Sequence, residues 1–230
     1  MAAFSLGLLT SPSVAKHGPA LPLLAGLELP RGSVVELTAP SGLARTTQLA
    51  LIACATAQRI SRALSHDGDS RWCGWIDATG SLYAPAVVEA GVELTRLLVV
   101  RPDAEELAKI AVCMAASRLF SVLVLDRAGV PGASVTAKRT RWDIAVRRLA
   151  LACESSDTTV ILLSDEHVAK SAPLPVAMRI EVTRPDSSRL SLRVVKDRRG
   201  IEGGARFVSL AHRAPPPRGA SAVGSKRASM

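Results

Sequence analysis

Residues 30–50 read PRGSVVELTAPSGLARTTQLA, and this stretch decides the fold. Its apolar run Ser33 to Leu37 predicts a β-strand, a turn follows, and residues from about Leu43 to Leu64 predict a helix. Farther along the chain, short apolar runs alternate with longer segments of helical periodicity. This alternation is typical of βαβ units around a mostly parallel sheet, so the stretch predicts the first unit of an α/β fold.

The same periodicities predict the remaining elements of the sheet and its helices. The predicted strands are Trp72–Asp77, Leu97–Val100, Val122–Asp126 and Thr159–Leu163, and the predicted helices are Pro85–Ala90, Ala104–Ala116 and Arg141–Cys153. A polar, Gly- and Pro-containing loop is expected over 127–136. Residues 177–183 and 190–195 alternate apolar and polar side chains, which predicts a C-terminal antiparallel hairpin at the edge of the sheet.

The chain divides into three parts by composition. We expect an N-terminal segment over 1–20, one core domain over 21–212 and a basic, disordered tail over 213–230. Of a formal net charge of +9, the tail carries four cations and no acid. Such a tail either solubilises the chain or serves as a nucleic-acid arm.

Composition excludes several classes of protein. Only 3% of the 230 residues are aromatic, which leaves little for stacking successive bases of single-stranded nucleic acid. Four well-separated cysteines form no metal-binding pattern with the four histidines, so no metal site is predicted. No signal peptide and no membrane span is recognisable, and a cytoplasmic protein without a membrane partner is expected.

Residues 30–50 are similar to the phosphate-loop region of the RecA family, in which a strand, a Gly-Pro turn and Gly-Lys-Thr-Thr precede a helix. The resemblance continues at Trp75–Ala78, at Gly91–Val92 with Leu97–Val99, at Pro102–Asp103 and at the apolar strand ending in Asp126. It covers roughly residues 21–200 in the same order. What it implies is a RecA-like P-loop NTPase core.

Departures from the RecA pattern fall on the residues that carry its chemistry. A phosphate loop needs glycines, so that backbone N–H groups wrap the phosphates, and a lysine for the terminal phosphates. The corresponding positions here are Ala39, Ala44, Arg45 and Thr46, and Thr79 stands where RecA proteins have a catalytic glutamate. We therefore predict no catalytic residue, no ATP hydrolysis and no resident cofactor. Weak binding of ATP and Mg²⁺ through Arg45, Thr46 and Asp126 stays open.

A shortened RecA-like chain with a broken phosphate loop resembles the ImuA family. The resemblance implies a non-catalytic adaptor in SOS-induced translesion synthesis and mutagenesis. Its partners would be an ImuB-type polymerase relative and RecA, met through the surface that RecA uses against its neighbour. The alternatives are a regulator that caps RecA filaments, a SulA-like inhibitor of cell division and a circadian-clock type ATPase domain.

Two basic clusters accompany this core. One surrounds Trp142 on a predicted helix and consists of Lys138, Arg139, Arg141, Arg147 and Arg148. One interpretation is a docking face that binds DNA phosphates or an acidic partner protein, with Trp142 as its anchor. The other is a solvated basic helix whose Trp142 packs inward. The other cluster, Arg193, Lys196, Arg198 and Arg199, is expected at a surface turn. Ser164 to His167 are adjacent in sequence and so do not predict a catalytic triad.

Overall fold

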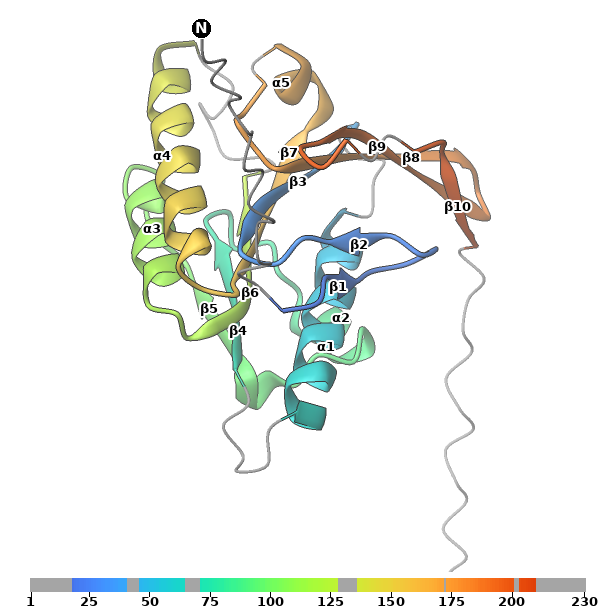
Figure 1. Cartoon of the computed structure of the whole chain (residues 1–230), viewed down its shortest axis with the longest axis horizontal. Coiled ribbons are helices and arrows are strands. Elements are labelled where there is room, and N and C mark those ends of the chain that lie inside the picture. Colours follow the sequence, from blue (N-terminus) through green and yellow to red (C-terminus); the bar gives the residue numbers. More distant parts are fainter. Residues whose placement is uncertain are drawn as a thin grey trace, which may run out of the picture.

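An eight-stranded sheet runs through the protein, and helices cover both of its faces (Figure 1). The computed structural model describes residues 18–40, 46–64, 71–127, 136–171, 173–200 and 203–209. In spatial order, the strands are β10 (Arg206–Ser209), β9 (Arg189–Asp197), β8 (Met178–Asp186), β3 (Ser33–Ala39), β7 (Thr159–Asp165), β6 (Phe120–Asp126), β4 (Trp72–Asp77) and β5 (Leu97–Val100).

The strands from β8 to β5 are parallel, and β9 and β10 run antiparallel at the other end. The predicted mostly parallel α/β sheet with a C-terminal antiparallel hairpin is confirmed. The hairpin β8–β9 joins the sheet through β8, which pairs in parallel with β3. β3 therefore lies inside the sheet, between β7 and β8.

Five α-helices and one 3₁₀ helix occur in the described residues. They are α1 (Thr46–Leu64), α2 (Ala84–Glu89), η1 (Leu94–Arg96), α3 (Leu107–Ala116), α4 (Thr136–Glu154) and α5 (Glu166–Ser171). A two-stranded ribbon, β1 (Leu21–Pro22) with β2 (Glu28–Leu29), packs beside α1 (Figure 1). None of these helices combines the length and the apolar character needed to cross a bilayer.

Each face of the sheet has its own core. On β3, Val35 and Leu37 belong to the cluster beneath α1, whereas Val34 belongs to the cluster beneath α3 and α4. Successive strand residues point to opposite faces, so Glu36 and Thr38 share the α4 face with Val34. All three are buried. Burial on both faces explains why β3, β6 and β7 are almost continuously apolar.

Some elements differ from the predicted ones. α4 begins at Thr136, five residues before the predicted start, and the short helix α5 was not predicted. The short strands β1, β2 and β10 were not predicted, because runs of two to four residues carry too little periodicity. Residues 213–230, the predicted disordered tail, lie outside the described residues.

Candidate functional site at the carboxyl ends of the strands

The carboxyl ends of β3, β7, β6 and β4 meet along one edge of the sheet, where parallel α/β sheets bind ligands. Ala39 ends β3 and pairs with Asp165, and Asp126 ends β6 and pairs with Asp77. Thr46, the first residue of α1, is buried there with Ala39 and Asp126. The fold therefore places Ala39, Thr46 and Asp126 at strand and helix ends that a phosphate loop would join. Ala44 and Arg45 lie outside the described residues.

Asp77 is fully engaged by the turn that follows β4. One carboxylate oxygen accepts the backbone N–H of Ser81 at 2.9 Å, and the other accepts that of Leu82 at 3.1 Å and the Arg101 Nε at 3.3 Å. The same turn needs the positive φ of Gly80, +69°. Both carboxylate oxygens of Asp77 thus serve to fix the backbone of this turn.

Thr79 lies in this turn, exposed to solvent, and its hydroxyl donates to Ser81 Oγ at 3.0 Å. A threonine hydroxyl is not a general base near neutral pH. Within the described ranges, no three His, Cys, Asp or Glu side chains are placed to hold a metal ion. Thr79 is therefore no base for the activation of water.

Arg127 directly follows Asp126 and is only 6% exposed. Its guanidinium lies 4.2 Å from the centroid of the Trp142 ring, and its Nη1 donates to Ser164 Oγ at 3.4 Å. Burial lowers the pKa of Arg127, an effect that the carboxylate of Glu36 opposes. Sequence reasoning missed this residue; its place directly after a buried strand-end aspartate was the available signal.

Trp142 is 8% exposed and packs inward against Arg127. This packing agrees with the second interpretation, a ring that packs inward, because the ring covers the buried guanidinium. Arg147 and Arg148 are exposed on α4, both about three turns from its start. Lys138, Arg139 and Arg141 belong to α4, but their side chains lie outside the described residues. A DNA or partner contact by the five cations stays a prediction.

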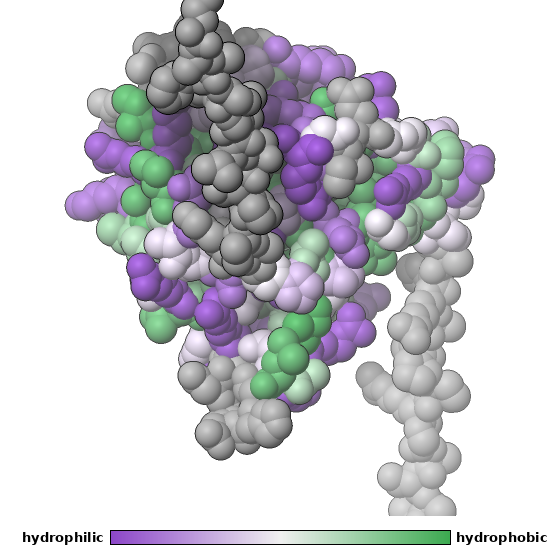
Figure 2. Space-filling view, viewed as in Figure 1, coloured by the Kyte–Doolittle hydropathy of each residue, from purple (hydrophilic) through white to green (hydrophobic). Residues whose placement is uncertain are grey.

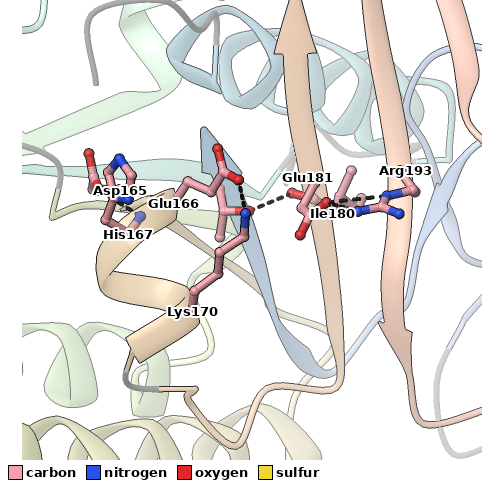
Figure 3. A network of polar contacts seen from close by, with 8 residues as sticks. Asp165, Glu166, His167, Lys170, Ile180, Glu181 and Arg193 are labelled. Atoms are coloured by element: carbon pink, nitrogen blue, oxygen red, sulfur yellow. Dashed lines mark hydrogen bonds and ion pairs between the residues drawn. The ribbon is translucent and has the colours of Figure 1, made fainter. Parts of the chain in front are cut away.

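Residues 164–167 serve separate purposes at the end of β7 (Figure 3). Asp165 accepts the backbone N–H of His167 at 2.8 Å and thereby caps α5, while Glu166 pairs with Lys170 one turn later. Arg193 pairs with Glu181 across β8 and β9 at 2.5 Å. Ser164 is bound by Arg127 instead of a histidine, so the geometry gives no catalytic triad.

The second basic cluster holds the hairpin in place. Lys196 donates to the Leu174 carbonyl oxygen at 3.3 Å, Arg198 donates to that of Pro175 at 3.2 Å, and Arg199 pairs with Asp197 at 3.0 Å. The expected surface turn follows β9 at residues 198–199. These contacts attach residues 173–177 to β9.

Glu36 and Arg179 form a buried ion pair that sequence reasoning also missed. They are register partners on β3 and β8, and Arg179 Nε lies 2.8 Å from Glu36 Oε2. Glu36 is fully buried, and the Arg179 side chain is 12% exposed. The charged Glu36 within the otherwise uncharged strand β3 was the signal in the sequence.

Comparison with known proteins points to RecA. No protein-family model matches the chain. Protein RecA of Rhodospirillum centenum is 36% identical over 99 residues, which are 43% of this chain and 25% of that protein. Protein RecA of Chelativorans sp. is 30% identical over 148 residues, 59% of this chain and 38% of that protein. The chain thus aligns with a quarter to two fifths of these relatives, and the matches together with the α/β sheet support a RecA-like relationship.

Proposed function

We propose that this protein is a non-catalytic, RecA-like adaptor of the ImuA type, acting in SOS-induced translesion synthesis and mutagenesis in the cytoplasm. The observation that carries the proposal is the turn after β4. Asp77 has both oxygens occupied by Ser81, Leu82 and Arg101, and Thr79 stands where the RecA pattern has its glutamate. At the position of Thr79, a nucleotide bound at this edge would meet no base to activate water.

Residual nucleotide binding is part of the proposal. Thr46 and Asp126 lie at the same edge of the sheet, and Arg45 precedes Thr46 in sequence. We expect ATP with Mg²⁺ to bind weakly at most, because arginine does not reproduce the compact charge of the phosphate-loop lysine.

The partner surface that the fold favours is the open edge strand β5. β5 pairs only with β4 in the described sheet, and Leu98 and Val99 are 43% and 38% exposed. Leu94, 51% exposed, precedes it in η1. An open edge with apolar side chains accepts an added strand through backbone hydrogen bonds and side-chain contacts. We infer that an ImuB-type polymerase relative, and RecA, dock along β5.

Calorimetry and pull-down with purified ImuB and RecA, with and without ATP and single-stranded DNA, test the proposal. Nucleotide-independent binding to ImuB is expected. Leu98→Glu places a charge in the contact and should weaken binding at least about tenfold, roughly 1.4 kcal/mol. Leu151→Glu is the matched control, since Leu151 is 65% exposed on α4.

Two outcomes contradict the adaptor role. One is absence of binding to both partners; the other is ATP turnover above background that disappears in Asp126→Ala. The alternative, a regulator that caps RecA filaments through the same open edge, predicts a different result. One molecule should bind at each RecA filament end and stop the growth of the filament, and Leu98→Glu should restore growth.

A further inference from the structure

Unpartnered buried polar atoms gather on the α4 face of the sheet. Among the described residues, four buried side-chain nitrogen or oxygen atoms have no hydrogen-bond partner, and three of them are Glu36 Oε1, Arg127 Nε and Arg179 Nη2. The fourth, Trp75 Nε1, belongs to the core beneath α1. Most buried polar groups in proteins are hydrogen-bonded, so three on one face indicate a missing water or ligand.

The side chains form a row across the sheet. Glu36 on β3 pairs in register with Arg179 on β8, which pairs in register with Lys196 on β9. Arg127 approaches from the other side, through Ser164 on β7. Ser164 is the register partner of Thr38, two residues from Glu36 and so about 7 Å along β3.

The row holds more positive than negative charge. Burial and the neighbouring Arg179 and Arg198 lower the pKa of Lys196, and Glu36 opposes the shift there as it does at Arg127. Three cations thus share one carboxylate. Because Arg127 is buried and its Nε has no hydrogen-bond partner, an external anion would be stabilised here.

The unpartnered atoms specify the kind of anion. Arg127 Nε and Arg179 Nη2 require acceptors, whereas Glu36 Oε1 requires a donor. Guanidinium groups suit phosphate oxygens. A phosphate that retains one proton supplies acceptors and a donor together, whereas a phosphodiester carries no proton to donate.

We propose that Arg127, Arg179 and Lys196, together with Glu36, bind a phosphate that retains at least one proton, either inorganic phosphate or the phosphomonoester end of a larger molecule. The proposed site lies on the α4 face of the sheet. It is independent of ATP hydrolysis and of docking at β5.

Thermal unfolding of the full chain tests the site. At about pH 6, near the second pKa of a phosphomonoester, inorganic phosphate should raise Tm above the value in chloride of equal ionic strength. Arg127→Gln/Lys196→Gln should bind phosphate about tenfold more weakly or worse, because two charged hydrogen bonds are lost. Arg193→Gln is the control, since Arg193 is exposed and paired with Glu181 on the same hairpin. If the double variant does not fold, Lys196→Gln alone, at a half-buried position, takes its place.

Oligonucleotides with a 5′-phosphate or a 5′-hydroxyl end separate the two sources. If the chain prefers the oligonucleotide with the 5′-phosphate, the ligand is a phosphomonoester terminus. If inorganic phosphate raises Tm and neither oligonucleotide binds, the ligand is the free anion. Equal binding of both oligonucleotides would show a diester contact and contradict the proposal. No gain over chloride, or an equal gain in the double variant, would mean an adventitious ion only and overturn it.

Discussion

The two faces of the central sheet bury different kinds of side chain. Beneath α1, Leu37 of β3 lies beside its register partner Ile180 of β8, and both are apolar. One residue earlier on each strand, Glu36 and Arg179 face α4 as an ion pair. An apolar face is stabilised by packing alone, whereas each buried charge needs a specific partner. The α1 face therefore holds the fold together, and the α4 face is where a ligand has something to recognise.

Removing one member of the ion pair should have the largest effect. Arg179→Met leaves Glu36 buried without its cation, and we expect a loss of about 3–5 kcal/mol in the free energy of unfolding by urea denaturation. The double variant Glu36→Leu/Arg179→Met should recover most of this loss. Arg193→Met breaks an exposed pair and should cost less than about 1 kcal/mol. Equal losses for Arg179→Met and Arg193→Met would show that the buried ion pair matters no more for stability than the exposed one.

A cavity on the apolar face should cost slightly less. Leu37 is fully buried, so Leu37→Ala should lower the free energy of unfolding by about 2–5 kcal/mol, without changing phosphate binding. Leu151→Ala, at an exposed position on α4, should change it by less than about 0.5 kcal/mol. If Leu37→Ala abolishes the phosphate response while the chain remains folded, the two faces are not independent.

Gly74 of β4 tests how tightly the sheet packs against α3. A Cβ at this position of β4 would lie 2.8 Å from Leu123 Cδ1 and 3.0 Å from Met114 Cε. Gly74→Ala should therefore destabilise the chain by about 1–3 kcal/mol through overpacking. Gly203→Ala has no atom within 4 Å of the added carbon and serves as the control in the same thermal scan. A Gly74→Ala variant as stable as Gly203→Ala would show that α3 moves away freely.

Near neutral pH the smallest effect is expected from Cys153 on the α4 face, because its contribution to stability changes only at high pH. Burial raises the pKa of Cys153 from 9.0 to about 12, so the folded thiol stays protonated where the unfolded one ionises. The buried, protonated thiol makes its full contribution to the free energy of unfolding below about pH 9. Between pH 9 and 12 this contribution is lost, by roughly 1.4 kcal/mol per pH unit. Cys153→Ala should show a shallower decline in unfolding midpoint above pH 9. Identical slopes would place the thiol in contact with solvent.

The sequence predicted the parallel strands well because β3, β4, β6 and β7 are short apolar runs between turns. α4 was predicted too short, since its first turn is polar and lacks helical apolar spacing. The strand-end positions of Ala39, Thr46 and Asp126 followed from the order of the elements. Two contacts could not be predicted: the stacking of Arg127 on Trp142 and the ion pair of Glu36 with Arg179. Side-chain contacts between segments far apart in sequence depend on how the strands align.

The placement of β3 inside the sheet also has a consequence for synthesis of the chain. Its two partner strands, β7 and β8, begin about 120 and 140 residues after it ends. At roughly 5–20 residues per second, the ribosome needs about 6–24 s to deliver the first of them. During that interval the run SVVELTA has no strand to pair with, although it is already made. Folding of the nascent chain therefore depends on protection of this early segment, and chaperone depletion should reduce the soluble yield.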